Sequence, residues 1–485
     1  MSQDAVRWNA VKRRAAEVNA MSQTKPKSVA GKSVPRVASD LQRVFPLPLT
    51  AFEEYMVADD RRDYPMTFSI ELTLTGELHS EQFLDAHKLA THRNPLLASH
   101  LVRKRHGNHW EWAPGESRVE FSDEATPVDY AMSDRRINLR EEPAVRTRLH
   151  ATGEKIRIAF VFHHAATDGV GAMNFIGDLL AAYGQLTTEL GEECPTLPEV
   201  SVQHLTRRGH LWNSQSVPHR SWRRTLGHLL EFATRMPTGI ARSPAAETEQ
   251  LQRPFVTRIV DRQRLRDIKQ VARRWEVQPN DIYLACLFLT LEHWNATVRQ
   301  SDADPWYRIL IPTSLRTFEH DAMPAANVLS FVLVNNRNAR RSIPTVLVKS
   351  LHGRVTRILE TADSRLFVRV LSAVRSVPGG LRLLTQSSVR TCTAVLANVG
   401  DVRRQLRCHF PLKKGKCVAG SVTLDGLFGA APIRPGTAVG ISLGTYAGEL
   451  LINFNCDPHS FPGAIAEQFA DSFLEHLGQL HKDLL

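Results

Sequence analysis

The chain has 485 residues, of which 42% are hydrophobic and 23% are charged, and its formal net charge is +11. This length predicts two domains of roughly 150–220 residues each, and the composition is typical of a globular protein. No apolar run approaches the roughly 18–20 residues needed to cross a bilayer, so we expect no membrane-spanning helix. Six widely spaced cysteines without a CxxC pair favour reduced thiols and a cytoplasmic location over a disulfide framework.

Much of the positive charge lies in residues 1–40, where eight Lys and Arg residues stand against three acidic residues. This stretch lacks the apolar core of a secretory signal. Its Ala, Ser, Lys and Pro content predicts a disordered basic arm over residues 1–42, with Met1 or Met21 as the first residue. Because no recognised nucleic-acid-binding module accompanies the charge, we expect no nucleic-acid partner.

Residues 43–186 alternate between strand and helix patterns and are predicted to form the first folded half. Ser80 is expected to cap a helix that ends at His92. The other predicted elements are a short helix over 51–58 and strands over 68–74, 98–104, 109–113, 144–150 and 156–162. This alternation predicts an α/β (α+β) fold.

Residues 187–253 are rich in Pro, Ser, Arg and His and are predicted to form a linker. Within it, the apolar residues of segment 221–236 share one helical face. The other face carries Arg224, His228, Glu231 and Arg235. The simpler interpretation is an amphipathic helix packed on the folded body. The alternative is a basic helix that contacts a membrane surface or covers a site.

Residues 254–485 are predicted to form the second folded half. The expected elements are helices over 261–275 and 282–294, strands over 307–311, 328–334 and 389–398, a hairpin over 438–455 that turns at Ala447-Gly448, and a closing helix. No tandem repeat relates the two halves in sequence.

Residues 163–169 read HHAATDG and lie between a predicted strand and an apolar helix. Successive strand residues face opposite sides of a sheet, so only one of His163 and His164 can point into a given cleft. A neutral imidazole, with an ordinary pKa of about 6.5, is suited to remove a proton from a hydroxyl or amine that attacks a thioester. Asp168 can stabilise the turn. Gly169 allows close backbone approach and can present an N–H to a developing oxyanion.

Other interpretations of these patterns are weaker. A buried hydrogen-bonded pair would explain His163 and His164 but not the acid and glycine that follow. A zinc site lacks a third ligand at a suitable spacing, so no metal is expected. Residues 440–444 read GISLG and match the GxSxG of serine hydrolases. That nucleophile requires a strand, a sharp turn and a helix, whereas Ser442 lies inside a predicted hairpin strand.

The HHAATDG segment resembles the HHxxxDG motif of chloramphenicol acetyltransferases, nonribosomal condensation domains, alcohol acyltransferases and bacterial wax ester synthases. Weaker similarities follow in the same order over residues 43–480. They are FPLPL at 45–49, HRNPLL at 92–97, QPND at 278–281, ILIPTSLR at 309–316 followed by Asn327, ANVG at 397–400 and TYAG at 445–448. Residues 425–429 read DGLFG where plant members carry DFGWG, which argues against the plant branch.

The resemblance implies two chloramphenicol acetyltransferase-like subdomains that form a V around a central tunnel. It implies that His164 lies midway along the tunnel as the general base. Asp168 is then structural and pairs with Arg316, and Asn398 supports the site. The co-substrate is an acyl thioester of coenzyme A or of a carrier protein, and no cofactor is bound permanently.

Three functional hypotheses follow from these observations. The first is an acyltransferase that moves an acyl group, other than an aminoacyl group, from the thioester to a small-molecule or lipid alcohol. The second is a free-standing condensation enzyme that forms an amide. The third is a non-catalytic descendant that binds lipid or protein in the tunnel, and the retained base, acid and glycine argue against it.

Overall fold

The computed structural model describes the chain in several stretches. They are residues 40–105, 107–113, 119–122, 136–209, 236–241, 255–299, 305–337, 339, 342–360, 365–386 and 390–484. Except for their last residues, the basic arm expected over 1–42 and the amphipathic helix expected over 221–236 lie outside these stretches. The chain is already helical at residues 40–44, where Leu41 is fully buried.

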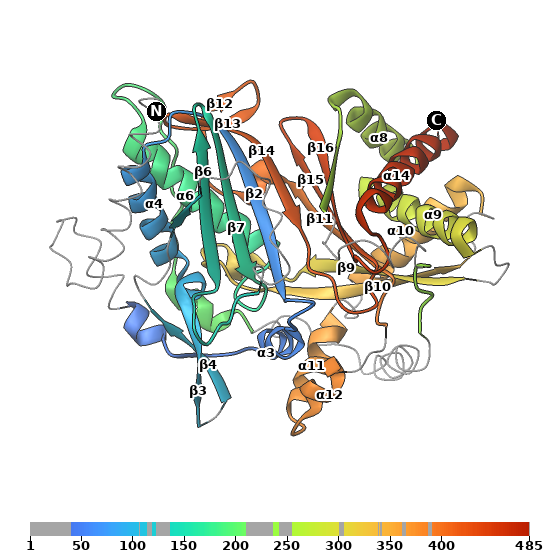
Figure 1. The fold of residues 1–485 in the computed structure, drawn as a ribbon, viewed down its shortest axis with the longest axis horizontal. Helices are drawn as coiled ribbons and strands as arrows, with labels where there is room; N and C mark the ends of the chain where they lie inside the picture. Colours follow the sequence, from blue (N-terminus) through green and yellow to red (C-terminus); the bar gives the residue numbers. More distant parts are fainter. Residues whose placement is uncertain are drawn as a thin grey trace.

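Seven strands form the sheet of the first half, in the order β12-β13-β14-β2-β7-β6-β5 (Figure 1). These strands are β2 (Thr67–Gly76), β5 (Val119–Phe121), β6 (Val145–Thr152), β7 (Lys155–His163), β12 (Leu412–Lys413), β13 (Lys416–Ala419) and β14 (Val422–Ala430). β6 and β7 form a hairpin, and β7 pairs antiparallel with β2 along its whole length. The end of β7 therefore lies beside the start of β2.

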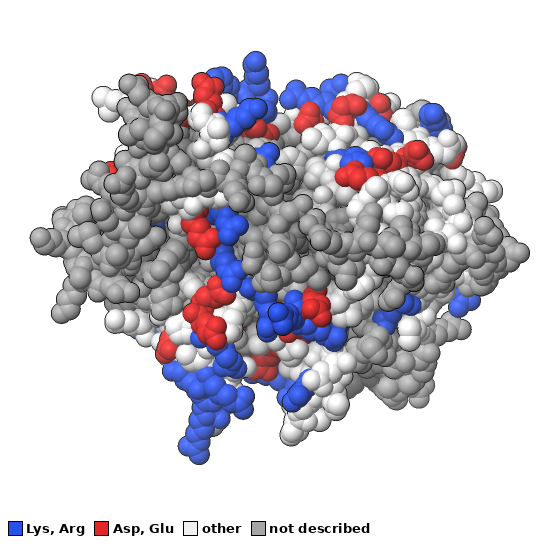
Figure 2. All heavy atoms as spheres, in the orientation of Figure 1, with Lys and Arg blue, Asp and Glu red and all other residues white. Residues whose placement is uncertain are grey.

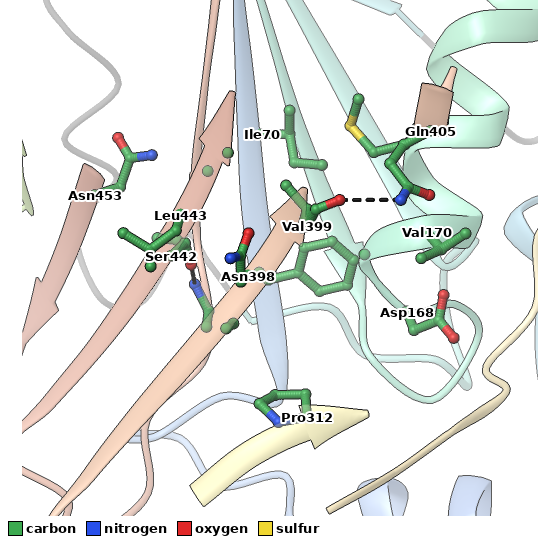
Figure 3. A pocket seen from close by; sticks show the side chains of 18 of the residues that line it. Ile70, Asp168, Val170, Pro312, Asn398, Val399, Gln405, Ser442, Leu443 and Asn453 are labelled. Atoms are coloured by element: carbon green, nitrogen blue, oxygen red, sulfur yellow. Dashed lines mark hydrogen bonds between the residues drawn. The ribbon is translucent and has the colours of Figure 1, made fainter. Parts of the chain in front are cut away.

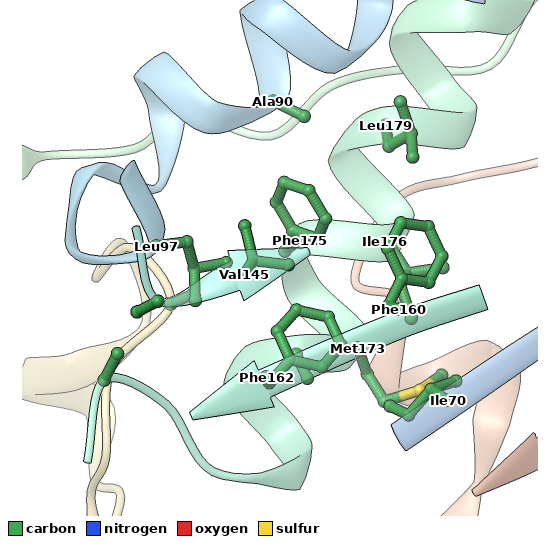
Figure 4. Packing of buried hydrophobic residues seen from close by; sticks show 14 of the residues in the cluster. Ile70, Ala90, Leu97, Val145, Phe160, Phe162, Met173, Phe175, Ile176 and Leu179 are labelled. Carbon is green, nitrogen blue, oxygen red and sulfur yellow. The ribbon is translucent and has the colours of Figure 1, made fainter. Parts of the chain in front are cut away.

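Helices α4 (Ser80–Arg93) and α6 (Gly169–Thr187) pack against this sheet (Figure 1). Phe160 and Phe162 of β7 lie 5.8 and 5.9 Å, between ring centroids, from Phe175 of α6 (Figure 4). Aromatic pairs at this separation stabilise the fold beyond the burial of their apolar surface. The end of β7 and the start of α6 are thus held together by a close-packed core.

Three strands of the first sheet come from the C-terminal part of the chain. β14 pairs antiparallel with β2 from Val422 opposite Gly76 to Ala430 opposite Ser69. The register shifts between Leu424 and Gly426. The chain between β11 and β15 therefore crosses from the second half into the first and returns.

Six strands form the second sheet, in the order β10-β9-β11-β15-β16-β8. They are β8 (Phe255–Val260), β9 (Trp306–Ser314), β10 (Leu329–Arg337), β11 (Ala394–Asp401), β15 (Val439–Tyr446) and β16 (Glu449–Cys456). Its apolar face packs against α8 (Arg262–Arg274), α9 (Pro279–Arg299), α10 (Pro344–Glu360) and α14 (Gly463–Leu484) (Figure 1). Ile441, Ile452 and Phe454 belong to this second core. The opposite face of the sheet looks toward the first half.

The remaining elements are short. They are β1 (Leu47–Pro48), β3 (Ser99–Lys104) and β4 (Gly107–Trp112), which form a small third sheet, helices α3 (Ala51–Asp59), α11 (Leu366–Arg375), α12 (Gly380–Gln386) and α13 (Val402–Gln405), and the 3-10 helices η1 (Pro95–Ala98), η2 (Val202–Arg207) and η5 (Phe318–His320). Helices α11 and α12 lie beside α3 at one end of the molecule (Figure 1).

The described surface carries mixed charge. In Figure 2, Lys and Arg side chains lie among Asp and Glu side chains on the face shown. A basic projection at the lower edge is the β3–β4 hairpin, where Arg103 and Lys104 are exposed. Lys104 lies 3.8 Å from Glu111, so part of this charge is paired.

The sequence predicted most of these elements. The strands expected over 144–150 and 156–162 are the β6–β7 hairpin, and the hairpin expected over 438–455 is β15–β16. The prediction that Ser80 caps α4 is wrong. His79 occupies the capping position, and its side chain makes no capping bond. Its backbone N–H donates to the hydroxyl of Tyr183 at 3.0 Å.

Two further expectations concern membrane spans and cysteines. Within the described stretches, we find no helix that combines the length and the apolar character needed to cross a membrane. All six cysteines are free thiols, and only Cys194 is exposed.

Replacing Gly177 by alanine should destabilise the protein. A Cβ there would overlap the carbonyl oxygen of Leu406 and lie 2.8 Å from its carbonyl carbon. Because backbone cannot move aside like a flexible side chain, we expect the free energy of unfolding to fall by about 1–3 kcal/mol. The exposed Gly353 of α10, with no atom within 4 Å of its Cβ position, is the matched control. Gly353→Ala should raise that free energy by about 0.5–1 kcal/mol. Urea unfolding measures both, and equal shifts would contradict the packing argument.

Candidate active site

The HHAATDG segment forms the turn between β7 and α6. His163 is the last residue of β7 and Gly169 the first of α6. The backbone N–H of His164 donates to the carbonyl of Met66 at 2.7 Å, and the N–H of Ala166 donates to the carbonyl of His163 at 3.0 Å. The first bond attaches the turn to the residue before β2 and the second closes the turn itself, so the backbone of His164 has a fixed position.

A hydrogen bond sets the orientation of the His164 ring. Its Nδ1 lies 3.1 Å from the carbonyl oxygen of Thr167. A carbonyl can only accept, so the ring donates its Nδ1–H there and Nε2 remains unprotonated. Asn327 Nδ2 donates to the backbone carbonyl of His164 at 2.6 Å. Asn327 Nδ2 also lies 3.4 Å from His164 Nδ1, but both nitrogens carry protons, so neither accepts a hydrogen bond from the other.

His163 points away from the pocket. Its side chain is 1% exposed, and its Nδ1 accepts the backbone N–H of Ala165 at 3.1 Å. Burial, together with the neighbouring His164, lowers the pKa of His163 to about 3. The ring is therefore neutral near pH 7.

Burial also lowers the pKa of His164 below its ordinary value. Hydrogen bonds to backbone carbonyls and the nearby carboxylate of Asp168 act in the opposite direction but do not cancel it. The imidazole of His164 is thus neutral at pH 7 and can accept a proton without first losing one.

Asp168 connects the two halves. Its Oδ1 caps α6 by accepting the N–H of Gly171 at 2.8 Å. Arg316, which follows β9, donates from Nη1 to Oδ2 at 2.7 Å and from Nη2 to Oδ1 at 2.9 Å. Oδ2 also accepts the N–H of Val328 at 2.9 Å. The Asp168–Arg316 ion pair expected from the resemblance is therefore present.

The charge of Asp168 is fully compensated. Burial alone would raise the pKa of Asp168, but the guanidinium of Arg316 and the N–H groups of Gly171 and Val328 hold it below its ordinary value. A buried carboxylate without such partners would be strongly destabilising. With both oxygens occupied by these donors, Asp168 is suited to a structural role.

The two glycines at the start of α6 differ in their surroundings. A Cβ on Gly171 would overlap the hydroxyl of Thr167 and lie 2.9 Å from the backbone nitrogen and oxygen of Ala326. Gly169 has ordinary space, with the nearest atom, Val399 Cγ1, at 3.7 Å. Gly169 instead lines the pocket. As the first residue of the helix, it has an N–H without an intrahelical acceptor.

A pocket of about 260 Å³ lies between the two sheets (Figure 3). The first half contributes an apolar wall that includes Phe68, Ile70, Val170 and Met173. The second half contributes most of the polar side chains. They are Thr313, Ser314, Asn398, Gln405, Ser442 and Asn453. His164 lines the same pocket, so both halves surround the imidazole.

Asn398 stabilises the strand end at the edge of this pocket. Its Oδ1 accepts the N–H of Gly400 at 2.8 Å, and its Nδ2 donates to Asn280 Oδ1 at 3.3 Å. Gly400 has a φ of +74°, which an L side chain rarely adopts. The amide of Asn398 therefore bridges the turn at the end of β11 to the start of α9.

The rival chemistries find no support in the described stretches. No group of three or more His, Cys, Asp and Glu residues there is placed to hold a metal ion. Ser442 lies in the middle of β15, between β11 and β16. It is therefore not on the strand–turn–helix elbow that a serine hydrolase requires.

Two polar residues at the site were not predicted from the sequence. Asn327 was noted only within the resemblance, and its bond to the His164 carbonyl depends on a contact 163 residues away in the chain. Asn453 lies on β16, where Leu451, Asn453 and Asn455 share one face. The alternation of β16 could have predicted this position, because it places the amides of Asn453 and Asn455 on the face opposite the apolar core.

Solved structures share this fold at low sequence identity. SgcC5 from Streptomyces globisporus is 16% identical, with 90% of this chain and 98% of that chain covered and a TM-score of 0.60. Polyketide synthase associated protein 5 from Mycobacterium tuberculosis is 15% identical over 89% and 97% of the two chains, with a TM-score of 0.59. A mutant starter condensation domain of rhizomide synthetase RzmA in complex with C8-CoA is 14% identical over 90% and 94%, with a TM-score of 0.62.

These similarities confirm the predicted α/β fold. No curated protein matches the sequence. The model of the family described as "Condensation domain" matches residues 56–301, just over half of the chain. The chain therefore belongs to the condensation-domain family.

Proposed function

We propose that this protein is an acyltransferase that moves an acyl group from a thioester of coenzyme A or a carrier protein to a hydroxyl acceptor, with His164 as the general base. The observation that carries the proposal is a neutral, oriented imidazole on the wall of a pocket lined by both halves. The condensation-domain family comprises enzymes of acyl transfer or amide formation. The C8-CoA complex of the related starter domain supports a thioester as the donor.

The proton and electron balance of the step is simple. Nε2 of His164 takes the proton of the acceptor hydroxyl as its oxygen attacks the thioester carbonyl. A C–O bond forms, the C–S bond breaks, and the leaving thiolate takes the proton back from the imidazolium. No redox partner is required, and no permanently bound cofactor enters the reaction.

Gly169 is the residue that we assign to the oxyanion. Its N–H belongs to the first turn of α6, where the helix dipole favours negative charge. The residue lines the same pocket as His164. Donors placed in advance at a developing oxyanion lower the barrier without reorganisation during the reaction.

Amide formation is the alternative reaction. The related starter domain has also been solved with C8-CoA and Leu-SNAC together, which favours an amine acceptor for that relative. Nε2 of His164 can deprotonate an amine by the same geometry. Because the same base serves both reactions, an activity assay with alcohols and amines is needed to identify the acceptor class. We keep the small-molecule or lipid alcohol as the first choice and the amine as the second.

Replacing His164 by alanine should reduce kcat/KM by about 10²–10⁴-fold, the usual contribution of a general base. Release of coenzyme A from octanoyl-CoA, measured in parallel with a panel of alcohols and a panel of amines, gives the rate and identifies the acceptor class. His459→Ala, an exposed histidine, is the matched control and should retain activity. Full activity of the His164→Ala variant would refute the assignment of the base.

The rate should fall on acidification with a midpoint below the ordinary histidine pKa of about 6.5. Only neutral His164 can accept the proton, and burial lowers its pKa, so the reaction should be independent of pH near neutrality and decline at lower pH. A midpoint above pH 7 in kcat/KM would contradict this.

Stability must be followed in the same titration. His163 has a pKa of about 3 when folded and about 6.5 when unfolded, so stability is lost as the pH falls below about 6.5. Intrinsic fluorescence separates this loss from protonation of the base.

Replacing Arg316 by alanine should lower the free energy of unfolding by about 3–5 kcal/mol, because it leaves the buried charge of Asp168 without its cation. Arg316→Lys keeps the charge but not the two-pronged geometry, so it should cost less. Arg403, whose ion pair with Asp401 spans 3.8 Å on the surface, is the control, and its alanine variant should change stability by at most about 1 kcal/mol. Similar losses for Arg316→Ala and Arg403→Ala in urea unfolding would show that the Asp168 pair is not structural.

A further inference from the structure

Two polar side chains lie side by side on the wall that the second half contributes to the pocket. Ser442 of β15 is directly opposite Asn453 of β16 in the antiparallel register. The same row continues to Ala397 of β11 and to Thr257 of β8. Ser442 and Asn453 both line the pocket (Figure 3). They are the polar residues of this row that line the pocket, and they lie on the face of the sheet away from the helices.

The amide of Asn453 has a defined orientation. Its Oδ1 accepts the hydroxyl of Thr257 at 3.0 Å, and the residue is only 4% exposed. The bond from Thr257 is the one hydrogen bond that the side chain of Asn453 makes with the described residues. Asn453 Nδ2 is not one of the fully buried side-chain atoms without a partner, and the residue lines the pocket, so the nitrogen reaches the open space there. The nitrogen of Asn453 is therefore available to a group inside the pocket.

The hydroxyl of Ser442 has spare donor capacity as well. Its Oγ accepts the backbone N–H of Ala431 at 3.2 Å, which leaves the O–H free to donate. No imidazole of the described chain contacts this Oγ, so the serine has no base to make it a nucleophile. The GxSxG pattern at 440–444 thus marks a binding group and not a catalytic one.

The flanking glycines explain the rest of that pattern. A Cβ on Gly440 would lie 3.2 Å from Ile433 Cγ2, and a Cβ on Gly444 would lie 3.1 Å from Val399 Cγ2. Gly444 lines the pocket beside Ser442. Small residues on both sides of Ser442 therefore let neighbouring segments pack closely while the hydroxyl stays accessible.

The opposite wall is apolar. Phe68, Ile70, Val170 and Met173 supply no hydrogen-bond acceptor to the two donors. A ligand that is hydrocarbon throughout would leave the Asn453 amide and the Ser442 hydroxyl unpaired. A ligand with an oxygen atom next to these two side chains would accept their hydrogen bonds. Sites built to bind a polar atom discriminate strongly against analogues that lack it.

We propose that Ser442 and Asn453 form a donor subsite for a carbonyl, ether or hydroxyl oxygen of a substrate, and that the pocket selects an oxygen-bearing substrate over a plain hydrocarbon one. The inference deepens the proposed acyl transfer and takes its reaction from it. The oxygen belongs to the thiol arm of the donor, to the acyl chain or to the acceptor, and the three sources require separate tests.

The test compares matched substrates in three arms. The first compares the N-acetylcysteamine thioester of octanoic acid with its S-pentyl thioester, which has the same length but lacks the amide of the thiol arm. The second compares 3-hydroxyoctanoyl-CoA with octanoyl-CoA. The third compares 2-butoxyethanol with 1-heptanol as acceptor, which have chains of equal length. We expect the wild type to prefer the oxygen-bearing member by at least about tenfold in kcat/KM in one arm.

The variants identify the groups responsible. Asn453→Leu and Ser442→Ala should each reduce that preference to less than about threefold, because the loss in rate falls mainly on the oxygen-bearing member. Thr257→Val, which frees the amide of Asn453 to rotate, should reduce the preference by a smaller factor. Ser472→Ala on α14, outside the pocket, is the control and should leave the preference unchanged.

Calorimetric binding of the same compounds to the His164→Ala protein separates the subsite from the reaction. A binding preference that Asn453→Leu abolishes would support the subsite even if no acyl transfer were detected in the wild type. The subsite is refuted if no arm shows a preference in rate or binding, or if Asn453→Leu and Ser442→Ala leave the preference intact.

Discussion

The Asp168–Arg316 ion pair is the interaction on which the candidate site depends. Asp168 ends the turn that carries His164 and also caps α6, while Arg316 follows β9 in the second sheet. The same carboxylate accepts the N–H of Val328, so it also anchors the segment that carries Asn327 to His164. Because one buried carboxylate accepts donors from both halves, the turn that carries the base is tied to the second half as well as to the first. The ion pair is therefore a positional constraint more than a source of net stability, as is common for buried pairs.

The environment of His164 resolves two opposed requirements. The ring must be buried enough to stay neutral, and it must still reach a substrate. Burial lowers its pKa, while the Thr167 carbonyl holds the Nδ1 proton and leaves Nε2 as the acceptor. The ring of His163, by contrast, is enclosed and does not line the pocket, and burial lowers its pKa to about 3. Two adjacent histidines therefore have different environments because successive strand residues face opposite sides of the sheet.

The sequence predicted what depends on local pattern. Alternation identified the strands β6 and β7 and the β15–β16 hairpin, and the HHAATDG segment identified the turn. The resemblance at 309–316 identified Arg316 as the partner of Asp168. The pairing of β14 with β2 could not be predicted, since it joins residues about 350 positions apart and no local propensity specifies it. For the same reason the contact of Asn327 with the base and the free donor of Asn453 became visible only in three dimensions. The capping position of α4 is His79 and not Ser80, and the backbone N–H of His79 donates to the hydroxyl of Tyr183, which is 104 positions away in the chain.

The two halves contribute different groups to the pocket. The first half supplies the proton acceptor and an apolar wall, and the second supplies polar groups at fixed register positions across β8, β16 and β15. Strands hold side chains more rigidly than loops do, so Asn453 and Ser442 can bind a substrate oxygen while the base stays in place. Residues 412–430 pair with the first sheet, so backbone hydrogen bonds join the two halves. These bonds act in addition to the Asp168–Arg316 ion pair. A change in substrate preference can therefore arise on the second sheet while the proton-transfer geometry on the first is preserved.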